Sequence, residues 1–224
     1  MSGRLQNLAT RIADAAVAAG CDPAMVRLLA VSKTWPADSV REAAAAGQHA
    51  FGENYVQEGV AKVDELAGLG LEWHFIGPLQ SNKTRLVANR FSWVHSIDRL
   101  KIAERLSEQR DVHLPPLEVC IQVNVSGEAS KSGVAPPDLP ELARAVAALP
   151  RLRLRGLMTI PEPTPDMALQ RARFASLRAM RDELNAAGLA LDTLSMGMSD
   201  DLEAAIAEGS TLVRVGTAIF GSRR

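Results

Sequence analysis

The amino-acid sequence predicts a single (β/α)8 barrel with one extra helix before it. Short β-branched apolar runs alternate with Ala-rich amphipathic stretches along the 224 residues, and no linker interrupts the alternation. The apolar runs number eight and are evenly spaced, which favours closure of parallel strands into a barrel. An open doubly wound sheet is the alternative architecture for such a pattern. The length also suits one domain.

Each element is assigned from its local pattern. The extra helix is expected over residues 4–19, where apolar side chains recur at helical spacing and Gly20 supplies a C-terminal cap. The strands are expected at 28–32, 49–52, 73–77, 93–96, 117–125, 155–160, 193–196 and 212–219. Helices are predicted over 36–46 and 166–187, the second with a core stripe of Leu169, Ala172, Phe174, Leu177, Met180 and Leu184.

The composition excludes several classes of partner. The chain carries 25 basic and 26 acidic side chains, whereas proteins that bind nucleic acid or anionic membranes have a basic excess. We find no signal-peptide pattern and no apolar run of membrane-spanning length. We therefore expect a cytoplasmic protein with no nucleic-acid and no membrane partner. Its two cysteines, Cys21 and Cys120, are expected to stay reduced and lack the spacing of a metal site.

Candidate reactive residues follow the first three strands, because barrel enzymes gather their active sites at the C-terminal ends of the strands. Lys33 follows the first strand, where desolvation lowers the pKa of the amine and favours Schiff-base formation with a carbonyl. A lysine that extends to solvent at the barrel rim is the alternative. Asn54 follows the second strand and offers polar atoms to a ligand or a helix cap. His74, in the third strand, is predicted to be a satisfied interior side chain.

A phosphate site is predicted after the seventh and eighth strands, where barrel enzymes frequently hold this group. Ser195 and Ser199 end the seventh strand, and Ser199 can cap the next helix. Gly216 and Thr217 follow Arg214 in the eighth strand. An amine opposite a phosphate cradle indicates a phosphorylated carbonyl ligand, such as pyridoxal phosphate or the substrate of a class I aldolase. Arg214 favours pyridoxal phosphate, whose ring nitrogen needs a partner.

Six ordered motifs carry a resemblance to a known family. They are AVSK at 30–33, FGENYVQE at 51–58, WHFIGPLQSNK at 73–83, GLMTI at 156–160, SMGMSD at 195–200 and RVGTAIFG at 214–221. Together they resemble the pyridoxal phosphate homeostasis protein family, also called the proline synthase co-transcribed family, over nearly the whole chain. The resemblance implies a pyridoxal phosphate-binding barrel domain over 1–224, of the type that forms the N-terminal domain of alanine racemase.

The resemblance also implies roles for individual residues. The cofactor would be pyridoxal 5′-phosphate, bound through Lys33. The other implied cofactor contacts are Asn54 near the ring, Arg214 at the pyridine nitrogen, and Ser195, Ser199, Gly216 and Thr217 around the phosphate. Lys131, after the fifth strand, lies near the place where the racemases use an arginine.

The family is regarded as a monomeric carrier of vitamin B6 that acts in amino- and keto-acid homeostasis, without an established reaction. Pyridoxal phosphate and the apo-forms of enzymes that use it are the implied partners. Racemases take a second base, a tyrosine, from a separate β domain, for which we expect no room here, and the only tyrosine is Tyr55. An arginine at the ring nitrogen also disfavours its protonation and weakens the cofactor as an electron sink. A slow amino-acid racemase is the alternative function.

Overall fold

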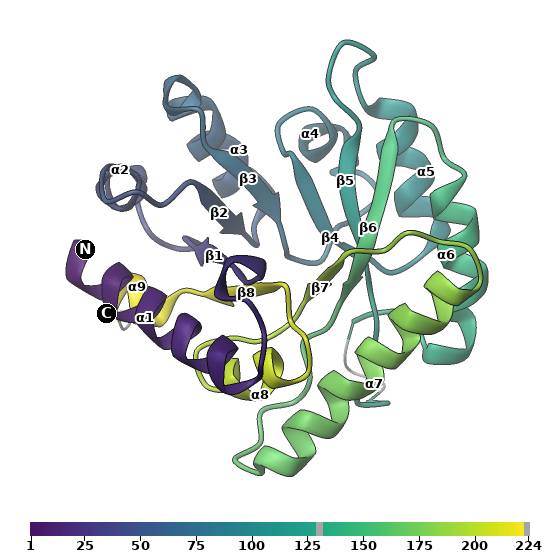
Figure 1. Cartoon of the computed structure of the whole chain (residues 1–224). Coiled ribbons are helices and arrows are strands. Elements are labelled where there is room, and N and C mark those ends of the chain that lie inside the picture. The colour runs from purple at the N-terminus through teal and green to yellow at the C-terminus, as the bar shows by residue number, and fades with distance from the viewer. Residues whose placement is uncertain (129–131, 222–224) are drawn as a thin grey trace.

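The computed structural model describes residues 1–128 and 132–221, and these form the predicted (β/α)8 barrel (Figure 1). Eight parallel strands pair in chain order, and β8 pairs with β1 to close the sheet, so the open-sheet alternative is excluded. The strands are β1 (Arg27–Val31), β2 (Ala50–Glu53), β3 (Glu72–Phe75), β4 (Trp93–Ile97), β5 (Leu117–Gln122), β6 (Leu152–Met158), β7 (Thr193–Ser195) and β8 (Leu212–Val215).

Helices follow the strands and surround the barrel (Figure 1). They are α1 (Ser2–Ala18), α2 (Ala37–Ala45), α3 (Val56–Glu65), α4 (Thr84–Ala88), α5 (Leu100–Gln109), α6 (Leu139–Ala147), α7 (Met167–Ala186), α8 (Leu202–Ala207) and α9 (Thr217–Phe220). The predicted extra helix is α1, which packs against α8 and α9. Arg4 Nη1 donates to the Ile219 carbonyl at 3.1 Å, and Arg11 forms an ion pair with Glu203, so the first helix is fastened to the end of the barrel.

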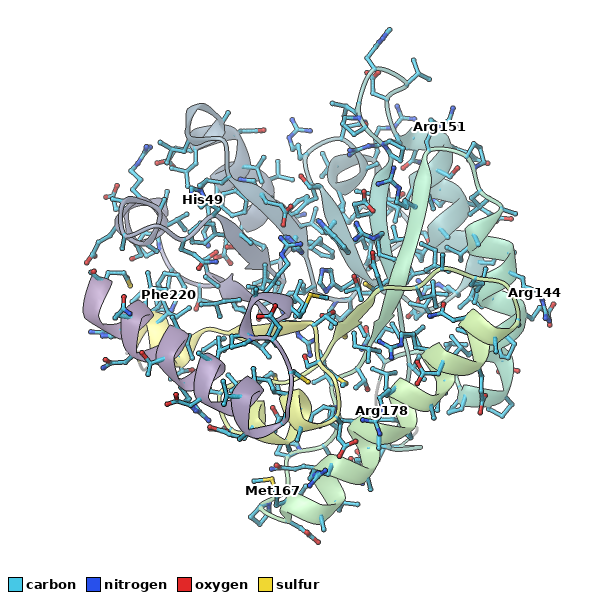
Figure 2. All side chains as sticks on the ribbon, in the orientation of Figure 1. His49, Arg144, Arg151, Met167, Arg178 and Phe220 are labelled. Carbon is cyan, nitrogen blue, oxygen red and sulfur yellow. The ribbon has the colours of Figure 1, made fainter. Side chains whose placement is uncertain are left out.

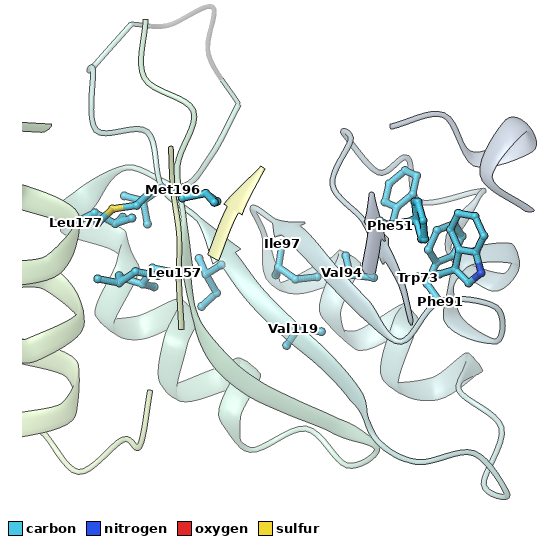
Figure 3. Close-up of a cluster of buried hydrophobic side chains, with 14 of the residues drawn as sticks. Phe51, Trp73, Phe91, Val94, Ile97, Val119, Leu157, Leu177 and Met196 are labelled. Carbon is cyan, nitrogen blue, oxygen red and sulfur yellow. The ribbon is translucent and has the colours of Figure 1, made fainter. Parts of the chain in front are cut away.

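Side chains along each strand alternate between the helix layer and the barrel interior. Phe51 and Trp73 pack together outside the strands, with ring centroids 5.7 Å apart (Figure 3). Leu157 and Met196 belong to the same core cluster as Leu177 of α7 (Figure 3). The residues that alternate with these face the interior. That interior holds two small apolar clusters together with buried polar side chains from β3, β4, β7 and β8.

Several predictions about element bounds and core residues are wrong. The fifth strand ends at Gln122 rather than at Val125. The eighth strand ends at Val215, and residues 217–219 belong to α9, because the Gly216 carbonyl turns to accept from the amides of Ile219 and Phe220 at 2.9 Å. In α7, Leu169 and Ala172 of the predicted core stripe are exposed, and Gln170 is buried instead. The side-chain Nε2 of Gln170 donates to the Thr164 carbonyl at 2.7 Å. The side of the first turn of α7 that packs on the preceding loop is therefore polar.

Solvent-facing side chains project from the outer helices. Arg144 on α6 and Met167 at the start of α7 are both exposed at the periphery of the molecule (Figure 2). Within the described ranges, no helix is both long enough and apolar enough to cross a lipid bilayer.

Candidate functional site

One pocket, of about 250 Å³, opens at the C-terminal ends of the strands. Its apolar lining includes Val31, Trp35, Ile76, Ile160 and Met198. Six of the seven residues predicted to contact a cofactor also line it, namely Lys33, Asn54, Ser199, Arg214, Gly216 and Thr217. The seventh, Ser195, is fully buried and is not among the lining residues. The structure therefore brings together residues that lie up to 184 positions apart in the chain, from Lys33 to Thr217.

Lys33 lies in a short segment that is held at both ends. On one side of it, Ser32 is buried and donates its hydroxyl to Glu53 Oε1 at 2.6 Å. On the other side, the Thr34 amide donates to Glu58 Oε1, and Thr34 has a φ of 68°, in the left-handed region that a β-branched residue rarely adopts. These contacts hold the backbone on both sides of Lys33, which is half-buried and lines the pocket.

A buried ammonium group connects the contacts on the two sides of Lys33. Lys62 of α3 is buried and donates to the Ser32 carbonyl, to Glu53 Oε1 and to Glu58 Oε1, each at 2.7 Å. Burial is the largest influence on Glu53 and raises the pKa of its carboxyl group, against the opposing effect of Lys62. This cluster was not among the residues predicted from the sequence. The spacing of Glu58 and Lys62, four residues apart on one helix, was the available signal.

Arg214 places a buried cation at the pocket. Its Nη2 donates to the Thr159 carbonyl at 2.8 Å, and its Nη1 donates to the Ser195 carbonyl and to Ser195 Oγ. No described carboxylate forms an ion pair with Arg214. Burial lowers its pKa to about 10, so the guanidinium remains charged at neutral pH. A buried cation without a counterion is suited to an electron-rich ligand atom.

The loop after β7 and the end of β8 also line the pocket, where β8 lies directly beside β1. A Cβ at Gly216 would lie 3.0 Å from the Val31 carbonyl oxygen, closer than most Cβ contacts, so glycine favours the close approach of these two segments. Thr217 begins α9, and the first amides of a helix have no carbonyl partner within it. Arg11 donates to the Ser199 carbonyl at 2.9 Å and steadies the loop.

The predicted capping role of Ser199 is wrong. Helix α8 begins at Leu202, and its N-cap is Asp201, so Ser199 lies two residues before the cap. Asp201 Oδ1 accepts from the Met198 amide and closes a turn that leaves Ser199 at the pocket. The predicted position of His74 is confirmed, since it is buried with both ring nitrogens in hydrogen-bond contact. Lys131 lies outside the described residues.

Comparisons with known proteins show which sequences and which fold this chain is similar to. Residues 4–224 match the family model described as "Alanine racemase, N-terminal domain". A pyridoxal phosphate homeostasis protein of Pseudomonas aeruginosa is 68% identical over 219 residues, which cover 98% of this chain and 94% of that protein. The protein of the same name from Escherichia coli K12 is 58% identical over 227 residues, covering 98% and 95%. The solved structure of PipY from Synechococcus elongatus PCC7942 with PLP bound is 40% identical, with a TM-score of 0.87, and the match covers 98% of this chain and 99% of that one.

Proposed function

This chain belongs to the alanine racemase N-terminal domain family and, within it, to the pyridoxal phosphate homeostasis proteins, and from that premise we propose that it binds pyridoxal 5′-phosphate through Lys33. The observation that carries the proposal is the convergence of a lysine, a buried arginine and a glycine-dependent cradle on one pocket. PipY, which is 40% identical and was solved with PLP bound, supports the same cofactor.

The residues of the pocket fit this cofactor. Asn54 Oδ1 is buried and has no hydrogen-bond partner among the described residues, so a ligand group can satisfy it. Arg214 supplies a donor without a paired carboxylate, and Gly216 lines the pocket where a Cβ would press on the Val31 carbonyl. Pyridoxal phosphate has a planar ring, a phosphate and an aldehyde. Asn54 and Arg214 suit the ring, Gly216 suits the phosphate, and Lys33 suits the aldehyde.

The chain's own residues have distinct tasks. Bound pyridoxal phosphate supplies an aldehyde that a primary amine captures reversibly and a ring that withdraws electrons when its nitrogen is protonated. The Lys33 amine attacks the aldehyde carbon, and loss of one water completes the Schiff base. Arg214 can only donate hydrogen bonds, so it favours a ring nitrogen that accepts one and carries no proton of its own. The phosphate is held by Ser199, Gly216 and Thr217. Ser195 does not touch the cofactor in this proposal but accepts a hydrogen bond from Arg214. Asn54 lies beside the ring.

We propose a carrier role for this site. The described residues act as one cofactor-binding barrel domain that buffers pyridoxal phosphate in amino- and keto-acid homeostasis and releases it to apo-enzymes. A reversible bond to Lys33 suits release of the cofactor. Arg214 disfavours protonation of the ring nitrogen, and catalysis at an amino acid needs the protonated ring as an electron sink. A monomeric state and a cytoplasmic location complete the proposal. Cys21 is an exposed free thiol, which is consistent with a reducing compartment.

The experiment is reduction of the bound cofactor. Purified protein mixed with pyridoxal phosphate is expected to show the visible band of a Schiff base, and borohydride is expected to fix the label on the peptide that contains Lys33. Lys33→Ala should abolish both signals, whereas Lys101→Ala, at an exposed lysine of α5, should leave both unchanged. Absence of the band, or its persistence in Lys33→Ala, contradicts the proposal.

Transfer is tested separately. Loaded protein is expected to reactivate an apo-enzyme that uses pyridoxal phosphate, and protein whose label has been fixed by borohydride is not. Equal reactivation by the reduced and unreduced forms would show that the enzyme takes its cofactor from contaminating free pyridoxal phosphate, which contradicts the carrier role.

A further inference from the structure

A chain of buried polar side chains connects the pocket with the opposite end of the barrel. Arg214 Nη1 donates to Ser195 Oγ at 2.8 Å, and Ser195 Oγ lies 2.8 Å from His95 Nδ1. His95 Nε2 lies 2.9 Å from His74 Nδ1, and His74 Nε2 lies 2.6 Å from Glu72 Oε1. Glu72 begins β3, whereas Ser195 ends β7, so the chain crosses the barrel interior from the N-terminal to the C-terminal ends of the strands.

Both imidazoles in this chain are neutral, and the carboxylate at its end is ionised. His74 and His95 are fully buried, and burial lowers the pKa of each, that of His95 well below the usual value. A neutral imidazole has one N–H and one acceptor nitrogen. The hydrogen bond from His74 is the main cause that lowers the pKa of Glu72 to about 2, and Arg27 adds an ion pair with N and O 2.5 Å apart.

The charged groups at the two ends determine the direction of every hydrogen bond. Glu72 can only accept, so His74 carries its proton on Nε2 and accepts at Nδ1. His95 must then donate from Nε2 and accept at Nδ1. Ser195 therefore donates its hydroxyl hydrogen to His95 and presents lone pairs to Arg214, which can only donate. Trp93 stacks on His74 with an interplanar angle of 5° and holds the plane of that ring.

We propose that Glu72 is a positioning residue for Arg214, which acts by setting the tautomers of His74 and His95 and thereby the orientation of the Ser195 hydroxyl. When an amide replaces the carboxylate, it can donate to His74, and both imidazoles can exchange tautomer. Ser195 then receives an N–H from His95, and its own hydrogen is free to turn toward the guanidinium, where two donors would meet. The tautomers are independent of any cofactor, but the consequence for a ligand at Arg214 rests on the proposed function.

The tautomers can be measured directly. The full chain with His49→Gln and His113→Gln, both at exposed positions, retains only the two buried imidazoles, whose ring nitrogens are then observed by 15N NMR. We expect both rings to carry hydrogen on Nε2. Glu72→Gln should move hydrogen to Nδ1 in a measurable fraction of both rings together. Glu118→Gln is the matched control, because Glu118 pairs with Arg155 at the same end of the barrel but is not part of the chain.

The second measurement follows the cofactor pocket. Glu72→Gln and Ser195→Ala are each expected to shift the absorbance maximum of bound pyridoxal phosphate and to weaken its retention by about tenfold, roughly the loss of one charge-assisted hydrogen bond. Ser195→Ala should nevertheless leave both histidines protonated on Nε2, because it interrupts the chain beyond them. Glu118→Gln should change neither the tautomers nor the absorbance.

Several results would overturn the proposal. It fails if Glu72→Gln leaves both tautomers as they are, if Glu118→Gln changes them equally, or if they change without any effect on the bound cofactor. If Glu72→Gln does not fold, Ser195→Ala decides the matter, since altered histidine tautomers or an unaltered absorbance in that variant contradicts the mechanism. If the parent chain binds no pyridoxal phosphate, the proposed function fails, while the NMR result still decides whether Glu72 sets the tautomers.

Discussion

Replacing Lys62 with methionine is expected to destabilise the protein in a way that depends on pH. The substitution removes three hydrogen bonds from one buried ammonium and leaves Glu53, which is fully buried, without its cation. Removing one member of a buried ion pair costs about 3–5 kcal/mol. For a protein of this size, that loss lowers the melting temperature by roughly 10 °C.

The pH dependence follows from Glu53. Burial already raises the pKa of this carboxyl group, and Lys62 opposes that rise, so Lys62→Met raises it further. An acid whose pKa is higher in the folded state favours folding below its unfolded value and loses that contribution as the pH rises through the folded value. The variant should therefore be least stable relative to the parent at pH 8 and should recover part of the difference at pH 5.

Urea unfolding at both pH values measures this effect. Glu53→Gln combined with Lys62→Met should recover most of the lost free energy of unfolding, because no buried charge is left unpaired. Lys101→Met, at an exposed lysine, should stay within about 0.5 kcal/mol of the parent. Equal losses at pH 5 and pH 8, or a double variant no more stable than Lys62→Met, would refute the reasoning.

Three further outcomes are expected. Gly216→Ala should weaken retention of pyridoxal phosphate by about tenfold, measured by absorbance after dialysis, because the new Cβ would press on the Val31 carbonyl at 3.0 Å; unchanged retention would contradict a cradle there. In a thiol-labelling assay, Cys21 should react at once and Cys120 only after unfolding, since Cys120 is fully buried and burial raises its pKa; rapid labelling of both contradicts the packing. Protein loaded with pyridoxal phosphate should not speed α-hydrogen exchange of alanine into deuterium oxide beyond the rate with free cofactor, and exchange that Lys33→Ala abolishes would instead favour the racemase alternative.

Much of the fold was predictable because barrel elements have strong local periods. Alternation between apolar runs and amphipathic stretches located every strand, with errors mainly at the ends, and the convergence of Lys33, Asn54 and Arg214 followed from their positions at or near strand ends. The errors arose where short-range pattern and local hydrogen bonding disagree. The apolar run after Gly216 has the composition of a strand, yet the carbonyl of that glycine starts a helix.

The sequence by itself therefore determined the barrel, its extra helix and the set of polar residues that gather around one pocket, because each of these depends on periodicity or on the common edge where parallel strands end. Only the tertiary structure decided which buried groups hold that set in place. Lys62 holds the segment that contains Lys33 by hydrogen bonds to Ser32 and Glu58. Glu72 is connected to Arg214 by hydrogen bonds through His74, His95 and Ser195. Apart from the Glu58–Lys62 pair within α3 and the Glu72–His74 pair within β3, these contacts join side chains from separate strands and helices, and no spacing along the chain encodes them.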